Sequence, residues 1–504
     1  MNANATLAPS LRHNLDMLKN ALGHSTDFIV RSFRIGDAPA FVSAALLYTE
    51  GLADSKIIDE FIMEPLMSGI CRSADFGARL ANHRDPLALL KDSVLTVNGL
   101  SVVPDAGVLL EAILSGDTAI LIDGSDRALI AATKGVEHRS IAEPASQTVI
   151  RGPLEGFVES IRVNTALIRR KIKDPRLWLE TIQIGTVTRT DVGIMYINGI
   201  ADDSIVREVR QRIERIDIDG ILESGYIEEL IQDEKWSPFP TIFNSERPDA
   251  ITAGLLEGRV AILVDGTPFV LLVPALFVQY FQSPEDYYHR WDVSSLIRMI
   301  RYMGFLIALV GPSVYIAVTT FHQEMIPTNL LINLASQREG VPFPAFIEAL
   351  LMEVTFEILR EAGIRMPRAV GSAISIVGTL VIGQAAVEAG IVSAAMVIVV
   401  SITAISSFVM PSYNMSISIR ILRFPLMGLA ASFGLFGIFI GLILLVLHLC
   451  SLKSFGAPYM TSIAPFYASN QKDTLFRLPR WGIAKRPRLL NRNNPTRGRN
   501  PPQT

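Results

Sequence analysis

Four glutamates in an apolar stretch of this 504-residue sequence are the residues best placed to do chemistry. Glu353, Glu357 and Glu361 repeat at every fourth position, which aligns their carboxylates on one side of a helix, and Glu348 lies on another side. A charge in the bilayer centre costs about 3 kcal/mol or more on insertion scales, so we expect these side chains to face protein or water.

The helix that carries these residues, predicted over 343–362, has two interpretations. It is either an interfacial or short re-entrant helix with a solvated charged face, or a helix whose carboxylates line a water-filled passage or gate for cations. Arg365 follows Glu361 by four residues and can pair with it in both cases.

The region around the acidic stretch is typical of a membrane domain. From Arg298 to Cys450 the sequence contains eight Arg and seven Glu but no Lys or Asp. Besides the acidic helix, four segments are apolar for about 20 residues, the length that crosses a bilayer: Tyr302–Thr320, Val370–Ala389, Ile391–Met410 and Leu426–Cys450. We therefore expect an α-helical multi-pass membrane domain over 293–450. The side of the C-terminal tail stays open, because it depends on whether the acidic helix spans.

Three glycines in the last apolar segment have the spacing of helix-packing residues. Gly434 precedes Gly437 and Gly441, which form a Gly-x-x-x-Gly pair. Small residues at this spacing let membrane helices approach closely. The alternative is that glycine is simply common in membrane helices.

The first half of the chain has the composition of a soluble α/β protein. An apolar run, Asp-Gly and a second apolar run occur at 118–133 and again at 260–275, and Asp-Gly between such runs indicates a hairpin. The shared pattern predicts two related subdomains, over 28–145 and 146–292, after an N-terminal extension, 1–27. The N-terminus lacks the apolar core of a signal peptide, so we expect this half to be cytosolic.

The tail over 451–504 is basic and rich in proline. It has ten Lys or Arg and one Asp. We expect it to be partly disordered and attracted to anionic lipid rather than to nucleic acid. The basic helix predicted at 160–173 could also meet lipid, although a solvated face is the simpler interpretation.

Catalytic motifs are missing from the sequence. It has no Walker A loop, no dinucleotide fingerprint, no His-Glu-x-x-His and no nucleophile elbow. The two cysteines, Cys71 and Cys450, are too few for a cysteine metal site or a disulfide framework. We therefore expect neither an enzyme nor a cofactor or metal.

Six stretches resemble the A subunits of GerA-type nutrient germinant receptors of endospore-forming bacteria. They are IRGPLEGFVESIRVNTALIRRKIKDPRLW (150–178), EGRVAILVDGTPFVLLVPALFVQYFQSPEDYYHRW (257–291), TTFHQEMIPTNLL (319–331), VPFPAFIEALLMEVTFEILREAGIRMP (341–367), IGQAAVEAGIVS (382–393) and MPSYNMSISIRILRFPLM (410–427). The resemblance extends from about residue 28 to about residue 465.

This resemblance implies a function that composition does not. Such receptors join an A subunit to a transporter-like B subunit that binds the nutrient and to a C-subunit lipoprotein, in the inner membrane of the spore. Nutrient binding releases monovalent cations and triggers germination. The A subunit is implied to form a homo-oligomeric ring that conducts the ions, which would place the four glutamates at the path or gate. The alternatives are a non-conducting scaffold that couples the signal, or a small-molecule or ion transporter.

Overall fold

The computed structural model describes residues 6–36, 40–68, 71, 73–83, 85–135, 143–144, 147–365, 383–467, 471–483, 486, 494 and 496. The chain divides into two compact units. The α/β unit comprises Met1–Gln232, Ile242–Pro274 and Ala484–Arg499, and the helical unit comprises Asp233–Thr241, Ala275–Ile483 and Asn500–Thr504.

The first sheet of the α/β unit has five antiparallel strands in the order β1-β2-β4-β5-β3. The strands are β1 (Phe28–Ile35), β2 (Val42–Thr49), β3 (Ser101–Val103), β4 (Thr118–Ile122) and β5 (Ala128–Ala131). The helices are α1 (Leu11–Ala21), α2 (Ser55–Ile58), a π-helical turn (Asp59–Met63), α3 (Glu64–Met67), α4 (Ala74–Asn82), α5 (Pro86–Ser93) and α6 (Ala106–Leu114).

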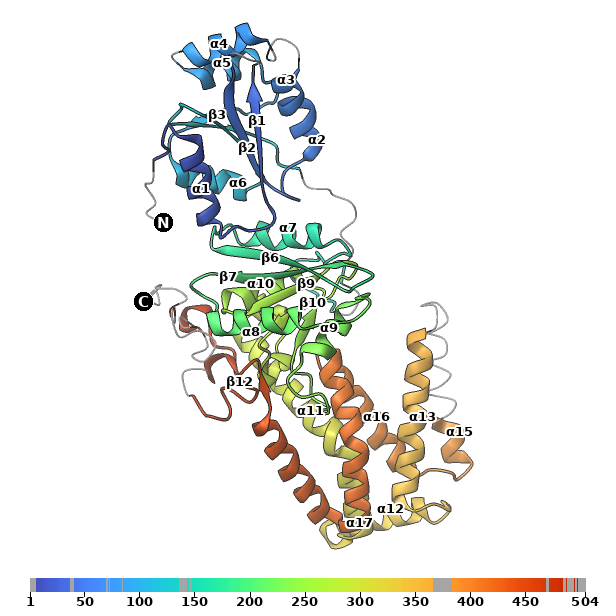
Figure 1. Ribbon diagram of the computed structural model, residues 1–504. Coiled ribbons are helices and arrows are strands. Elements are labelled where there is room, and N and C mark those ends of the chain that lie inside the picture. Colours follow the sequence, from blue (N-terminus) through green and yellow to red (C-terminus); the bar gives the residue numbers. More distant parts are fainter. Residues whose placement is uncertain are drawn as a thin grey trace. The chain divides into compact units, whose positions relative to one another are not determined.

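Strand alternation explains why helices cover both faces of this sheet (Figure 1). Ala45 and Leu47 of β2 point to the face covered by α1 and α6, whereas Ala44 and Leu46 point to the face covered by α2 to α5. Both sets are buried, so the central strands are apolar along most of their length.

The second sheet repeats the first, with the order β6-β7-β9-β10-β8. Its strands are β6 (Leu177–Ile184), β7 (Thr190–Ile197), β8 (Phe243–Ser245), β9 (Val260–Val264) and β10 (Val270–Val273). Its helices are α7 (Ile161–Lys171), α8 (Asp203–Glu214), α9 (Ser224–Ile231) and α10 (Pro248–Leu256). The helices α7 and α10 share one core with this sheet, as α1 and α6 do with the first.

The two predicted Asp-Gly hairpins occupy equivalent positions, so that expectation is confirmed. Asp123 follows β4 and accepts a hydrogen bond from the Leu11 backbone N–H at 3.0 Å, which caps α1. Asp265 follows β9 and accepts one from the Ile161 backbone N–H, also at 3.0 Å, which caps α7. In each subdomain, the equivalent aspartate therefore lies in the hairpin turn and caps the start of a helix.

Several expected boundaries need correction. The residues expected to be an N-terminal extension include α1, whose Leu11 and Leu18 are buried in the first core, so α1 belongs to the first subdomain. The second subdomain ends at Pro274 rather than at residue 292, because residues from Ala275 onward belong to the helical unit.

The helical unit consists mainly of six α-helices among the described residues. They are α11 (Trp291–Thr320), α12 (Thr328–Arg338), α13 (Ala345–Arg365), α15 (Gly383–Glu388), α16 (Ala394–Phe408) and α17 (Tyr413–Ser451). Short 3-10 turns lie at Phe277–Phe281, Pro284–Tyr287, Gln323–Met325, Gln471–Asp473 and Arg480–Gly482, and a small hairpin joins β11 (Lys453–Ser454) to β12 (Ala457–Pro458).

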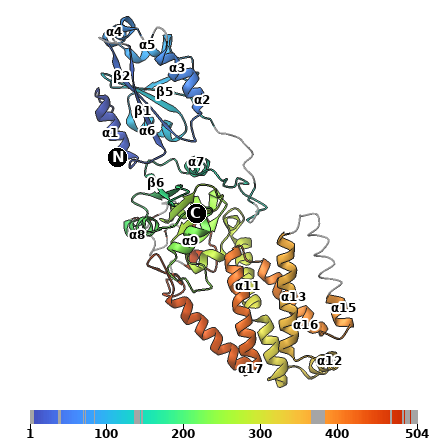
Figure 2. The ribbon, with the colours of Figure 1, turned by 45° about the vertical axis from the view of Figure 1, so that its right-hand side comes forward.

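The helix α17 is not one straight rod. Gly434 has φ 63° and ψ −142°, a non-helical conformation that only glycine adopts readily. The chain reverses there, so that α17 forms a hairpin of two arms (Figures 1 and 2). The single straight segment expected over Leu426–Cys450 is therefore wrong: its first residues lie on one arm and the rest on the other.

Two of the described helices, α11 and α17, are long and apolar enough to cross a membrane. The segment expected over Ile391–Met410 forms the shorter apolar helix α16, and most of Val370–Ala389 lies outside the described residues. More than two crossings therefore stay a prediction. Asp473 of the tail lies at the same end of α11 as residues 286–298, because it contacts Arg298.

Candidate functional site: the acidic helix and its arginine partners

The acidic stretch forms the 21-residue helix α13, as predicted. Its four glutamates do not share one environment. Glu348 and Glu353 are fully buried within the helical unit, Glu357 is partly buried, and Glu361 is exposed.

Glu348 fixes the beginning of α16. Its carboxylate accepts a hydrogen bond from the Ser393 backbone N–H at 2.6 Å and another from the Ser393 hydroxyl. Ser393 is the N-cap of α16, and its hydroxyl in turn accepts from the Met396 backbone N–H. A carboxylate at the positive end of a helix is favourable, so Glu348 joins α13 to α16.

Glu353 forms a buried ion pair with Arg423, which lies on the first arm of α17. The Arg423 guanidinium also donates from Nε to the carbonyl oxygen of Ala308, in the middle of α11, at 2.8 Å. One arginine therefore connects three helices of the helical unit. Neither side chain is more than 1% exposed, so the pair is shielded from water.

Glu357, one turn further along α13, pairs with Arg420 of the same α17 arm. Their side chains are 28% and 15% exposed, so this pair is at the edge of the packed region. Glu361 pairs with Arg365 on its own helix at 2.6 Å, which confirms the predicted i, i+4 pair. The stripe of carboxylates thus passes from the interior of the unit to its surface.

These pairs leave several buried polar atoms without partners. Among the described residues, no hydrogen bond reaches Oε1 of Glu353, Oε1 of Glu357, Nη2 of Arg423 or Nε of Arg420. Such atoms make a polar cluster costly, because each loses its water without gaining a full replacement. The contact between α13 and α17 is therefore less stable than the number of its charges suggests.

A different side of α13 from the one that carries Glu353 has an exposed apolar stripe. Ile347, Leu351, Val354 and Ile358 are all exposed and repeat at intervals of four, three and four residues. This spacing places them along one side of the helix. The charges of α13 thus mainly face its own chain, and its apolar stripe faces outward.

The three predicted packing glycines lie at the α17 hairpin. A Cβ added at Gly437 would overlap the carbonyl oxygen of Leu429, and one at Gly441 would lie 2.6 Å from Leu426. In a straight helix, residues 426 and 441 would be about 22 Å apart. The glycines therefore lie where the two arms of α17 approach each other.

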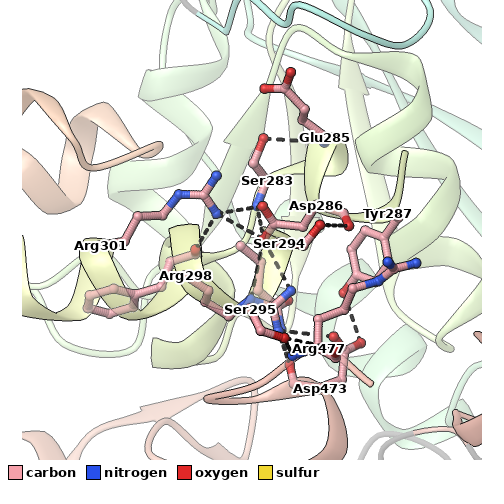
Figure 3. A network of polar contacts seen from close by, with 12 residues as sticks. Ser283, Glu285, Asp286, Tyr287, Ser294, Ser295, Arg298, Arg301, Asp473 and Arg477 are labelled. Atoms are coloured by element: carbon pink, nitrogen blue, oxygen red, sulfur yellow. Dashed lines mark hydrogen bonds and ion pairs between the residues drawn. The ribbon is translucent and has the colours of Figure 1, made fainter. Parts of the chain in front are cut away.

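A second ionic cluster, at the start of α11, was not predicted (Figure 3). The buried Asp286 accepts hydrogen bonds from Arg298 at 3.1 Å and from Arg301 at 2.8 Å. Arg298 also donates to a carboxylate oxygen of Asp473, far along the chain, at 3.1 Å. Arg477 donates to the carbonyl oxygen of His289. The tail segment 471–477 is therefore attached to the first turns of α11.

One signal in the sequence could have indicated the Glu–Arg pairs of α13. The apolar region has nearly equal numbers of Arg and Glu and no Lys, and the planar arginine fork suits buried pairing with carboxylates. The balance of charge favours pairing within the unit over solvation. It does not say which arginine meets which carboxylate.

The α/β unit offers a polar cavity, of about 210 Å³, between its two subdomains. The lining residues are Thr26, Asp27, Glu50, Ile161, Arg162, Thr165, Leu179, Thr181 and Asp191. Beside it, the buried Arg169 pairs with Asp27, which joins the subdomains. The described residues contain no group of three or more His, Cys, Asp or Glu that could hold a metal ion.

Known proteins resemble this chain over nearly its whole length. The family described as Bacillus/Clostridium GerA spore germination protein matches residues 16–489. Spore germination protein KA of Bacillus subtilis is 50% identical over 491 residues, which cover 97% of this chain and 88% of that protein. Spore germination protein GerLA of Bacillus cereus is 40% identical over 482 residues, covering 95% of each.

One solved structure is also similar, the N-terminal domain of the A subunit of the Bacillus megaterium spore germinant receptor GerK3. It is 41% identical to this chain, with a TM-score of 0.43, and the match covers 54% of this chain and 98% of that domain.

Proposed function

The chain belongs to the GerA spore germination protein family, and from this premise we propose that it is the membrane subunit of a spore nutrient-germinant receptor. It lies in the inner membrane of the spore with its N-terminal half in the cytoplasm. It assembles as a homo-oligomer with a transporter-like B subunit, which binds the nutrient, and a lipoprotein C subunit. Nutrient binding causes cations to pass through the oligomer, and germination follows.

One observation supports a gate at α13: this helix is held to α17 by two Glu–Arg pairs that leave buried polar atoms unpaired. Such an interface can adopt two discrete arrangements, the paired one described here and one in which new partners or water satisfy the free atoms. We propose that the receptor signal shifts α13 against α17 and that Glu348, Glu353, Glu357 and Glu361 change partners as the path opens.

A second candidate function is a non-conducting scaffold that couples the B subunit to another channel. The burial of Glu348 and Glu353 inside this chain favours it, because buried carboxylates do not line a passage in the state described. The two candidates differ in whether the purified chain alone moves ions.

The test uses Glu357→Gln and Arg420→Gln, because this pair lies at the edge of the unit and its loss leaves the core intact. We expect each variant to slow nutrient-triggered K⁺ release from spores by about tenfold, equivalent to about 1.4 kcal/mol of lost coupling, at unchanged amounts of the receptor. Glu339→Gln, which alters an exposed carboxylate at the end of α12, is the matched control and should release K⁺ normally.

A companion measurement separates conduction from scaffolding. The purified chain is reconstituted in K⁺-loaded vesicles, and efflux is compared between the wild type and Glu357→Gln. A variant-sensitive efflux supports conduction. Vesicles that show no K⁺ efflux, together with slowed K⁺ release from variant spores, support the scaffold. Normal K⁺ release from spores of both variants would show that α13 has no role in either candidate function.

A further inference from the structure

The tail segment 472–481, which we call the strap, has two contrasting sides. Asp473 and Arg477 point inward and are bonded to the start of α11 (Figure 3). The side chains that remain outside are apolar or cationic: Lys472, Leu475, Phe476, Arg480 and Trp481 are all exposed. The strap is therefore amphipathic, although it is not a regular helix.

Its inner side is fixed by contacts along one face of α11. The Ser295 hydroxyl donates to the Arg477 carbonyl oxygen at 2.9 Å and accepts from the Arg477 N–H at 3.1 Å. One helical turn later Arg298 holds Asp473, and another turn later the Tyr302 hydroxyl donates to the Thr474 carbonyl oxygen at 3.3 Å. The exposed side chains are thereby held at the level of α11 residues 295–302.

That level is where α11 begins to present an apolar surface. Arg298 and Arg301 are buried, and α11 has no charged residue after Arg301. On the neighbouring face, the side chains that are exposed from the second turn onward are hydrophobic: Leu296, Met299, Ile300 and Met303. If α11 crosses a membrane, the boundary between headgroups and acyl chains lies beside the strap.

We propose that the outer side of the strap is a binding surface for an anionic lipid bilayer. Leu475, Phe476 and Trp481 insert at the boundary, where aromatic side chains are favoured, and Lys472 and Arg480 meet lipid phosphates. The buried Asp286 cluster then has a purpose: it holds a short membrane anchor in register with α11. The inference rests on the proposed membrane role of α11.

The test places a fluorophore on single cysteines of the full chain, with Cys71→Ala and Cys450→Ser, in nanodiscs of phosphatidylcholine and phosphatidylglycerol. A probe at Phe476→Cys should be quenched by lipids that carry a nitroxide near the headgroup and be shielded from aqueous iodide. A second probe at Trp481→Cys should behave alike. Val187→Cys, exposed in the α/β unit, is the control and should respond only to iodide.

Charge is tested with Lys472→Gln and Arg480→Gln. Each should lower the excess of quenching by nitroxide-labelled phosphatidylglycerol over phosphatidylcholine, by up to about fivefold per cation removed. An unchanged excess would overturn the charged part of the proposal. Probes at 476 and 481 that behave like the Val187→Cys control would overturn the whole of it.

Two further outcomes are distinguishable. A probe at 476 that is shielded from iodide but not quenched by lipid, together with disulfide cross-linking of two chains in the unlabelled Phe476→Cys variant, would make the strap a protein contact and overturn the inference. A probe at Leu306→Cys, on the exposed apolar face of α11, reports the membrane span itself. If lipid nitroxides fail to quench it, the membrane role falls with the inference; if only 476 and 481 fail, the membrane role stands.

Discussion

Two buried carboxylates of the helical unit differ in the number of arginines that bind them. Asp286 meets two arginines, and Arg298 of that pair continues to Asp473 and the tail. Glu353 meets a single arginine, and polar atoms on both partners remain unpaired among the described residues. Both carboxylates are almost completely removed from water, so the difference lies in the number of partners.

This difference indicates different roles. A buried polar network whose members are satisfied makes a structure rigid, whereas a partly satisfied one costs free energy in every state that keeps it buried. Among the described residues, no buried polar atom of Asp286, Arg298 or Arg301 lacks a partner, so these three residues have the properties of a fixed joint, whereas the Glu353–Arg423 pair has those of a contact that can open. The fixed joint lies at the start of α11. The Glu353–Arg423 pair, which we call the exchangeable contact, lies where α13 and the first arm of α17 pack against the middle of α11.

The largest effect is expected at the fixed joint. Asp286→Asn removes the charge that neutralises Arg298 and Arg301, and leaving buried charges unpaired typically costs about 3–5 kcal/mol. We expect a lower midpoint of thermal unfolding for the detergent-purified chain and faster protease cleavage of the tail after residue 470. Asp292→Asn, which alters a partly exposed carboxylate in the same segment, should change neither. Equal behaviour of the two variants would show that the Asp286 cluster is not the joint.

A double replacement sharpens the comparison at the exchangeable contact. Exchanging a buried ion pair for apolar residues of similar size is often neutral or stabilising, by about 1–4 kcal/mol. We therefore expect Glu353→Leu with Arg423→Leu to unfold at or above the wild-type midpoint, while either single replacement lowers it. Spores with the double variant should nevertheless lose nutrient-triggered K⁺ release, because a contact that is always closed cannot respond.

The corresponding exchange at the first cluster is the control. Asp286→Leu with Arg298→Leu should destabilise, since the tail loses its bonds to Arg298 as well. If both double variants were equally destabilised, the two clusters would not differ as a fixed joint and an exchangeable contact do. The number of arginine partners of a buried carboxylate would then not indicate its function.

The sequence predicted features that depend on neighbouring residues. The Asp-Gly turns at Asp123 and Asp265 are specified by a dipeptide between apolar runs, and α13 by spacing along one helix. The order of the five strands was not predictable, because pairing depends on which elements meet after the chain has folded. The helix α1 was separated from its subdomain for the same reason, since nothing local shows that Leu18 packs on β2.

The arginine partners of the acidic helix could not be predicted from the sequence for a similar reason. Arg423 lies 70 residues from Glu353, and only the packing of α17 on α13 brings them together. The break at Gly434 was missed because a glycine in an apolar run indicates close helix packing as readily as a reversal. Asp473 was missed because one acidic residue in a basic tail carries no pattern.

A third carboxyl group, half-buried in the α/β unit, extends the comparison to a side chain with no cation beside it among the described residues. Glu228 of α9 accepts a hydrogen bond from the Asn244 amide at 3.2 Å. Burial raises its pKa from 4.5 to about 7; the Asn244 hydrogen bond opposes the increase, and the nearby Glu223 carboxylate adds to it. Asp286 and Glu353 each have an arginine partner, whereas Glu228 has no cation partner among the described residues, and burial favours its protonated form.

The sign of the resulting pH dependence follows from the raised pKa. The folded state binds the proton more tightly than the unfolded state, so the stability from Glu228 is complete below about pH 4.5 and is lost as the pH rises to about 7. With allowance for partial exposure, we expect the opening free energy of α9 to fall by about 1–2 kcal/mol over this range, measured by amide hydrogen exchange corrected for intrinsic rates. Glu228→Gln should abolish the change, while Glu229→Gln, its exposed neighbour, should retain it. A pH-independent opening free energy of α9 in the wild type would show that folding does not raise the pKa of Glu228.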